Sequence, residues 1–542
     1  MTTMNRSKTM VALAALVTGP AALGLAARAA DDVGSAGGKR WWSVVSYLAD
    51  DKLEGRDTGS AGHRQAAEFV ADQFARLGLK PAGTDGYIQP VRFRSKTIDE
   101  AHSTLALVRE GRTTPIELGP DAIISLRVDP AAEIEAPLVF VGHGLRSPEA
   151  KVDDFAGLDV RGKVVVILGG APESIPGALA AHLQSAGERG ALLRELGAVG
   201  MVTIANPKSM DIPWERSSLA RFLPQMALAD PGMDDYRGLK IAVSMNPARA
   251  DKLFEGTGQT IAAILAATDA SKPLPHFAIP AQLKATVAVD RADVTSQNVA
   301  AILPGTDPQL KDEYVAFTAH LDHIGVGKPI NGDPIYNGAM DNASGVASLI
   351  DVAARLKEAG VALKRSVLFV AVTGEEKGLL GSRYYATSPT VDRKAIVANI
   401  NTDMFLPLFP MKRLTVFGLA ESDLGDDATG VARALGMDTE PDPEPKRNVF
   451  IRSDQYSFIR QGIPAIALKV GYLKGSPEEA TAKKWLTERY HAPSDDLNQP
   501  VDLQAAADFD ALVARLIERV ANRDARPAWK AESFFRRFAG GM

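Results

Sequence analysis

The chain contains no cysteine among its 542 residues. That absence excludes a disulfide framework, a lipid-modified cysteine and any metal site built on thiolates. A metal site in this protein must therefore draw its ligands from histidine, aspartate and glutamate. These are the residue types to follow along the chain.

The chain also lacks a strong charge of either sign. It has 61 basic and 66 acidic residues, with a formal net charge of -5. A balance this close gives no field strong enough to recruit nucleic acid or an anionic membrane, so we expect no nucleic-acid partner. With 46% hydrophobic and 23% charged residues, the chain is long enough for more than one core, and we expect two or three domains.

Long apolar runs are missing after the N-terminal segment. There, Arg6 and Lys8 precede an apolar stretch from Met10 to Ala27, and Ala27-Arg28-Ala29 offers small residues where a signal peptidase cuts. This pattern predicts a signal peptide over residues 1–29 and a mature protein in a bacterial periplasm or outside the cell, without stable membrane insertion. The alternative, an uncleaved anchor, is disfavoured by Gly19-Pro20 inside the stretch.

The second half of the chain carries acidic and histidine residues at the ends of apolar runs. Because parallel strands deliver the residues at their carboxyl ends to one edge of a sheet, we expect these side chains to meet in a cleft. Three strand-like runs end in this way: Tyr314–Ala319 before His320, Ser366–Thr373 before Glu375 and Glu376, and Ile396–Thr402 before Asp403.

Three further residues complete the pattern. Asp341 stands before a helical repeat of apolar residues, where a carboxylate is either a helix cap or a ligand shared by two metals. Asp322 lies two residues after His320 and is placed to accept a hydrogen bond from the imidazole, which would fix its tautomer. His491 follows a fourth apolar run at 463–470.

Taken singly, each of these residues has an ordinary interpretation as a cap, an exposed loop or a structural histidine. Their common placement at strand ends favours a metal centre instead. Three carboxylates and two histidines supply two zinc ions with three protein ligands each, provided that one aspartate is shared. The mixed ligand set favours zinc, although manganese or cobalt could occupy similar ligands.

The same residues carry a specific family resemblance. The chain resembles the secreted two-zinc, co-catalytic aminopeptidases, in the superfamily that also includes glutamate carboxypeptidases, transferrin receptors and glutaminyl cyclases. The resemblance implies an α/β fold, with a three-layer αβα zinc exopeptidase domain around a central mixed sheet. It rests on His320-Leu-Asp322, Asp341-Asn-Ala-Ser-Gly, Gly374-Glu-Glu, Asn401-Thr-Asp403-Met, Ser453-Asp454-Gln-Tyr-Ser-Phe and Tyr490-His491.

A second resemblance concerns the middle of the chain. Asp153 to Leu168 and the Gly197-Ala198 step resemble a protease-associated domain, small, β-rich and of α/β type, inserted into the peptidase. The implied domains are a signal peptide at 1–29, the N-terminal part of the peptidase at 31–131, the insertion at 132–282 and the catalytic part at 283–542. Whether the insertion gates the substrate or is only an accessory stays open. The stretch from Gly325 to Met340 is longer than in minimal members, and we expect it to shape the cleft.

The resemblance also implies roles for single residues. His320, Asp341 and Asp403 would hold one zinc ion, and Asp341, Glu376 and His491 the other. Among the remaining residues, Glu375 would be the general base, Tyr490 would polarise the substrate carbonyl, Arg452 would contact the substrate backbone, and Asp322 and Asp495 would support the ligands.

The expected activity is that of a zinc-dependent aminopeptidase acting on peptides. A water bridging two zinc ions about 3.5 to 4 Å apart would be acidified, Glu375 would take its proton, and the hydroxide would attack a carbonyl polarised by zinc and Tyr490. Arg447 and Arg452 keep a carboxypeptidase open as an alternative, because such an enzyme needs cations for the terminal carboxylate. A receptor-like binding protein and a one-zinc glutaminyl cyclase are further alternatives. The oligomeric state has no signature in the sequence.

Overall fold

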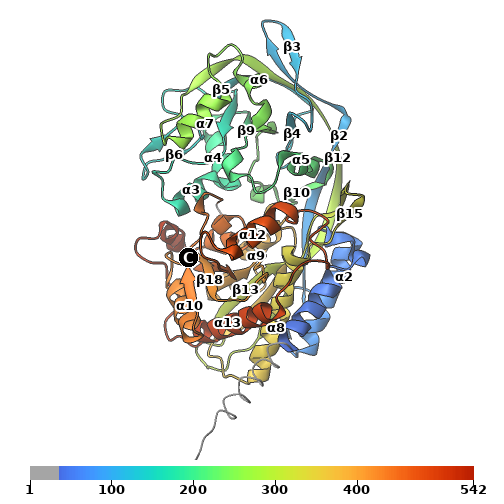
Figure 1. Cartoon of the computed structure of the whole chain (residues 1–542), viewed down its shortest axis with the longest axis vertical. Helices are drawn as coiled ribbons and strands as arrows, with labels where there is room; N and C mark the ends of the chain where they lie inside the picture. Colours follow the sequence, from blue (N-terminus) through green and yellow to red (C-terminus); the bar gives the residue numbers. More distant parts are fainter. Residues whose placement is uncertain (1–35, 448, 542) are drawn as a thin grey trace, which may run out of the picture.

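The computed structural model of the protein describes residues 36–447 and 449–541. The chain forms two lobes, stacked one above the other in Figure 1. The expected signal peptide at 1–29 falls outside the described residues. Within the described part of the chain, no helix combines the length and the apolar character that crossing a membrane requires.

A mixed sheet runs through the lower lobe. β13 pairs in parallel with β16 and β17, and β17 pairs in parallel with β20, whereas β18 and β12 are antiparallel to their neighbours β20 and β16. This confirms the expected mixed sheet. The strands, in spatial order, are β19 (Asp438–Glu440), β18 (Arg413–Phe417), β20 (Ala465–Val470), β17 (Ile396–Thr402), β13 (Tyr314–His320), β16 (Ser366–Val372) and β12 (Phe277–Leu303).

Helices cover both faces of this sheet, because its central strands are apolar on both sides. Val315 and Phe317 of β13 pack in one core with four helices, α2 (Ala61–Arg76), α8 (Ser344–Ala359), α10 (Asp423–Ala434) and α13 (Leu503–Ala521). The alternate residue Ala316 packs on the opposite face with side chains of α9 (Leu380–Thr387) and α11 (Gln455–Ile459). The lower lobe is therefore a three-layer αβα domain, as expected. Another helix, α12 (Pro477–Glu488), precedes His491.

A long antiparallel ribbon joins the two lobes. It consists of β2 (Ile88–Arg109) and β12, which pair from Val299 opposite Ile88 to Gln282 opposite Val108. One end of β12 pairs with β16 in the lower lobe, and the other end pairs with β5 in the upper lobe. The sheet is thus continuous through both lobes (Figure 1).

The upper lobe packs around a core of its own, to which Leu105, Leu107 and Ile124 contribute. These residues precede 132, so the packing unit begins within β2; the boundaries at 132 and 282 and the protease-associated character stay predictions. The strands of the lobe are β3 (Arg112–Pro115), β4 (Ala122–Ile124), β5 (Glu133–Phe140), β8 (Val164–Leu168), β9 (Gly200–Ile204), β10 (Gln225–Leu228) and β11 (Ile241–Met245). Its helices are α3 (Gly177–Gln184), α4 (Ala186–Leu196), α5 (Trp214–Ser217), α6 (Asp251–Phe254) and α7 (Ile261–Asp269).

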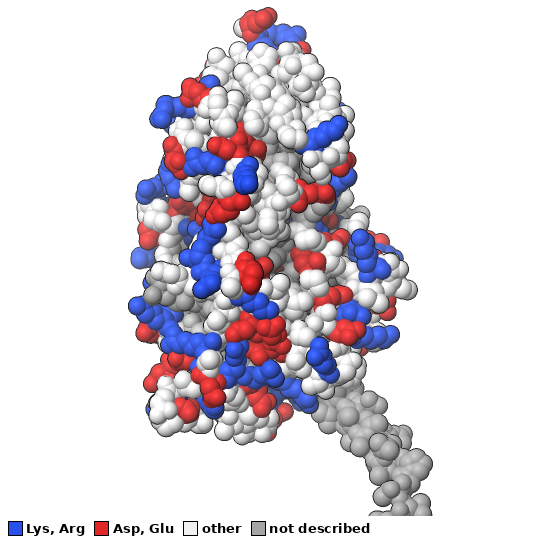
Figure 2. All heavy atoms as spheres, turned by 90° about the vertical axis from the view of Figure 1, so that its left-hand side faces the viewer, with Lys and Arg blue, Asp and Glu red and all other residues white. Residues whose placement is uncertain are grey.

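Acidic and basic side chains are interspersed over the face of the molecule that Figure 2 shows. Neither sign forms a continuous field across both lobes on this face. The near balance of charge in the sequence is thus also a local balance on this surface.

Candidate metal centre

The sequence-predicted ligands meet at the carboxyl ends of the central strands. His320 is the last residue of β13, Asp403 follows β17 directly, and Glu375 and Glu376 lie in the turn after β16. Asp341 precedes α8, in a short turn after the hairpin of β14 (Gly325–Ile330) and β15 (Asp333–Tyr336). The topology thus gathers residues that are distant in sequence at one edge of the sheet.

One group of ligand-type atoms surrounds His320. Its Nε2 lies 3.3 Å from Oδ1 of Asp341 and 3.4 Å from Oδ1 of Asp403. His320 and Asp341 are buried. The three side chains form a cluster that could hold a metal ion.

A second group shares Asp341. Nε2 of His491 lies 3.2 Å from Oδ2 of Asp341 and 3.3 Å from Oε2 of Glu376. The two oxygens of Asp341 therefore face different groups, Oδ1 the first and Oδ2 the second. A bridging carboxylate has this arrangement.

These spacings fit zinc. Zinc–nitrogen and zinc–oxygen bonds of about 2.0 to 2.1 Å in a tetrahedral site place two ligand atoms about 3.3 Å apart. The four separations measured around His320 and His491 run from 3.2 to 3.4 Å. In addition, Oδ2 of Asp341 is buried without a hydrogen-bond partner among the described residues. A buried carboxylate oxygen without a hydrogen-bond partner destabilises the fold unless it binds a cation.

His323 is a residue that the sequence reasoning missed. It is fully buried, and its Nδ1 lies 2.8 Å from Oε1 of Glu376 and 3.8 Å from Oδ2 of Asp341. His323, Asp341 and Glu376 form a second cluster that could hold a metal ion. The 2.8 Å separation is shorter and the 3.8 Å separation longer than the spacing of two zinc ligands, whereas both separations of His491 match it. The available signal was the second histidine in His320-Leu-Asp-His323.

Asp322 supports the centre in a way that differs from the expectation. Nδ1 of His320 lies 3.0 Å from the main-chain oxygen of Asp322, so the carbonyl and not the carboxylate fixes the imidazole. The carboxylate instead accepts hydrogen bonds from the main-chain N–H groups of Glu375 (3.1 Å) and Glu376 (3.3 Å) and from the hydroxyl of Thr58 (3.0 Å). It holds the turn that carries both glutamates.

Asp495 holds the turn that carries the shared ligand. Its carboxylate accepts hydrogen bonds from the main-chain N–H groups of Met340 (2.9 Å) and Asp341 (3.0 Å), and the side-chain amide of Gln499 donates to it at 2.7 Å. A carboxylate bound in this manner restrains the backbone on either side of Asp341.

Arg56 is a second supporting residue that the sequence did not reveal. Its fully buried guanidinium donates to the carbonyls of Leu321 (2.9 Å), Asn337 (2.7 Å) and Gly338 (3.0 Å). Burial lowers the pKa of Arg56 to about 10. This one side chain ties the loop after His320 to the segment before Asp341.

Glu375 faces the centre without belonging to either ligand group. Burial raises the pKa of its carboxyl well above the ordinary value. It lines a cavity together with Tyr490, whose ring lies 3.9 Å from that of His491, centroid to centroid. Burial also raises the pKa of Tyr490, which keeps its hydroxyl protonated and able to donate a hydrogen bond. Glu375 and Tyr490 thus face the same space.

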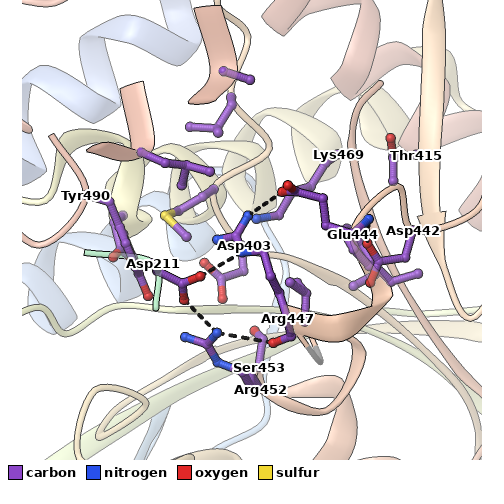
Figure 3. Close-up of a pocket in the computed structure, with 18 of the residues that line it drawn as sticks. Asp211, Asp403, Thr415, Asp442, Glu444, Arg447, Arg452, Ser453, Lys469 and Tyr490 are labelled. Carbon is purple, nitrogen blue, oxygen red and sulfur yellow. Dashed lines mark hydrogen bonds and ion pairs between the residues drawn. The ribbon is translucent and has the colours of Figure 1, made fainter. Parts of the chain in front are cut away.

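Arg452 lines the same cavity but already has a partner. Its Nη1 lies 2.6 Å from Oδ2 of Asp211, and Nε of Arg447 lies 2.7 Å from Oδ1 of the same carboxylate (Figure 3). Asp211 comes from the upper lobe, and no pattern in the sequence predicts its place here. The upper lobe therefore contributes to the wall of the cleft.

Residues 298–517 match Peptidase family M28. Over 215 residues, the chain is 29% identical to a protein named probable leucine aminopeptidase 2 from Aspergillus oryzae. This match covers 38% of this chain and 40% of that protein. Over 230 residues, the chain is 28% identical to leupeptin-inactivating enzyme 1 from Streptomyces exfoliatus. This match covers 40% of this chain and 47% of that protein. The matches thus span less than half the length of either relative.

The fold is similar to that of an aminopeptidase from Aneurinibacillus sp. strain AM-1. The TM-score is 0.55, and the match covers 90% of this chain and 95% of that one at 20% sequence identity. A likeness at this identity shows a shared fold across both lobes.

Proposed function

We propose that the protein is an exported, zinc-dependent aminopeptidase that removes N-terminal residues from peptides. The observation that carries the proposal is the pair of ligand groups around Asp341, whose separations of 3.2 to 3.4 Å suit two zinc ions. The chemistry belongs to a hydrolase, because Glu375 faces the same centre and is not needed as a ligand.

Each residue of the centre then has a separate task. His320, Asp341 and Asp403 would hold one zinc ion, and Asp341, Glu376 and His491 the other. When bound, the two ions would acidify a water and polarise the substrate carbonyl. Glu375 would accept the proton of the water and pass it to the leaving amine. Tyr490 would donate a hydrogen bond to the oxygen on which negative charge develops.

The charges around the cleft favour attack at the amino end. Glu375 and Asp403 supply negative charge beside the centre, where a free ammonium group would sit. The two arginines that a carboxypeptidase would use, Arg447 and Arg452, are both engaged by Asp211. The role of Arg452 as a contact to the substrate backbone would require it to release Asp211 or to use its remaining donors.

Mass spectrometry of peptide products tests this proposal. Unblocked and N-acetylated versions of one peptide are incubated with the zinc-loaded protein, with and without a chelator. We expect stepwise loss from the free amino end, abolished by acetylation and by chelation. Loss from the carboxyl end would make the protein a carboxypeptidase, and the absence of any cleavage with full zinc content would favour a binding protein.

The place of action is part of the proposal. The basic and apolar pattern before Ala29 supports export to the periplasm or the outside of the cell. Determining the first residue of the mature protein, expressed in a Gram-negative host, tests it. We expect the chain to begin near Ala30, and retention of residues 1–29 on a membrane-bound form would contradict cleavage.

The upper lobe, in our proposal a protease-associated domain, limits the substrate to peptides with a free end. It places Asp211 in the wall of the cavity that Glu375 and Tyr490 also line. A cleft closed on that side admits a chain terminus more readily than the middle of a folded protein.

A further inference from the structure

A cavity leads away from the metal centre into the lower lobe (Figure 3). Asp341, Asp403, Glu375 and Tyr490 line it, so a ligand bound at the centre would have one substituent beside this cavity. The cavity has a volume of about 110 Å³. This is room for a side chain.

Most of the cavity wall is apolar and would suit an aliphatic side chain. The apolar residues include Met404, Leu406, Phe409, Phe417, Val470 and Leu486. One feature does not suit such a side chain. Lys469 extends from β20 into the same space, between apolar neighbours on the strand.

Lys469 differs from the two other cations of the cavity. Arg447 and Arg452 are both paired with Asp211. Among the described residues, no carboxylate oxygen lies within 4.0 Å of Nζ of Lys469. Its nearest recorded interaction is with the ring of Phe417, at 5.9 Å from Nζ to the centroid.

The surroundings of Lys469 make its charge costly without a ligand. The side chain is partly buried, and burial lowers its pKa, against the opposing effect of the carboxylate of Asp403. A poorly solvated ammonium that lacks a close counter-ion gains from an incoming carboxylate.

Asp442 and Glu444 are two of the carboxylates that line the cavity, and both have other partners. Asp442 accepts the main-chain N–H of Glu444 at 2.8 Å. Glu444 is bound by Arg447 at 2.9 Å and lies 3.6 Å from Nζ of Lys483. Lys469 therefore differs from Arg447 and Arg452 in having no carboxylate oxygen within 4.0 Å among the described residues, and its ammonium is free to take one from a ligand.

We propose that Lys469 selects substrates whose N-terminal residue is aspartate or glutamate, by pairing with the carboxylate of that side chain in the cavity beside the metal centre. The inference rests on the proposed aminopeptidase function and adds its substrate class. The apolar wall receives the methylene groups of the side chain, and Lys469 receives its charged end.

The test compares peptides that differ only in the first residue. Glutamate, glutamine, leucine and lysine are placed at the amino end of one sequence, and kcat/KM is measured for the zinc-loaded protein and for Lys469→Met. The variant keeps the length of the side chain and removes its charge. Lys474→Met, an exposed lysine beyond the end of β20, is the matched control.

We expect the wild type to cleave the glutamate peptide about tenfold or more faster than the glutamine and leucine peptides. We expect Lys469→Met to lose this preference while keeping its zinc content, and Lys474→Met to behave as the wild type. Equal cleavage of all peptides, or a preference unchanged in Lys469→Met, overturns the inference and leaves the aminopeptidase proposal intact. No cleavage of any unblocked peptide by the fully zinc-loaded protein overturns both.

Discussion

At the scale of single residues, Glu375 and Glu376 are neighbours in sequence with different tasks. Glu376 touches His491 at ligand spacing, whereas Glu375 contributes to neither ligand group. We therefore expect Glu375→Gln to retain two equivalents of zinc and to lose about 100-fold or more in kcat, as for the loss of a general base. We expect Glu376→Gln to lose zinc instead. Metal analysis and steady-state kinetics of the two variants decide this, and a Glu375→Gln enzyme with unchanged kcat would exclude the proposed role.

The two histidines beside Glu376 allow an equally sharp comparison. His491 lies 3.2 and 3.3 Å from the two carboxylates of its group, and His323 lies 2.8 and 3.8 Å from them. Two ligand atoms of a tetrahedral zinc site lie about 3.3 Å apart, and only the two distances of His491 match this value. We expect His491→Gln to lose one of two zinc equivalents and His323→Gln to keep both, measured by atomic absorption after dialysis. The reverse result would make His323 the ligand.

The sequence predicted the residues of the centre better than their supports. The proposed ligands His320 and Asp403 lie at the ends of apolar strands, and this pattern can be read from the sequence alone. Arg56 and Asp211 reach the site from distant segments through contacts that have no local pattern. The prediction that the carboxylate of Asp322 accepts the hydrogen bond of His320 was wrong for a related reason. That carboxylate is engaged by the main-chain N–H groups of Glu375 and Glu376, and the sequence does not reveal how close this turn lies.

At the scale of elements, the turn after β16 depends on Asp322. Its buried carboxylate accepts the N–H groups of Glu375 and Glu376 and the hydroxyl of Thr58. Asp322→Ala would leave two main-chain donors without a partner, and we expect it to lower the free energy of unfolding by about 1 to 3 kcal/mol and to lower kcat even with full zinc. Thr58→Ala removes one donor only, and we expect a smaller loss. Urea denaturation and kinetics of both variants check this, and equal stabilities for Asp322→Ala and wild type would contradict it.

The elements themselves were predicted unevenly. The apolar strands β13, β16 and β17 and the helix α8 lie where the sequence indicated, because burial on both faces makes such strands continuous apolar runs. The ribbon of β2 and β12 was not predicted at its full length. Its residues alternate between buried and exposed along much of both strands, and β12 runs across the expected boundary at 282.

At the scale of the whole molecule, ion pairs connect the upper lobe to the lower lobe around the cleft. Asp211 pairs with Arg452 at 2.6 Å and Asp235 with Arg383 at 2.6 Å. Glu188 of α4 pairs with Arg460, which follows α11. Several of these residues line the space beside the metal centre. The relative position of the lobes, and with it the shape of the cleft, therefore depends on charge.

Glu188 makes this dependence measurable. A hydrogen bond with His182 and the charge of Arg460 lower its pKa from 4.5 to about 2, against the opposing effect of burial. Because the pKa is lower in the folded state, the stabilisation is complete above about pH 4.5 and is lost as the pH falls toward about 2. We expect Glu188→Gln to be less stable than wild type in urea at pH 7, with a difference that shrinks below about pH 4.5. Glu358→Gln, an exposed glutamate on α8, is the control and should show no such trend. A difference that stays constant from pH 7 into acid would mean that the charge of Glu188 does not hold the lobes together.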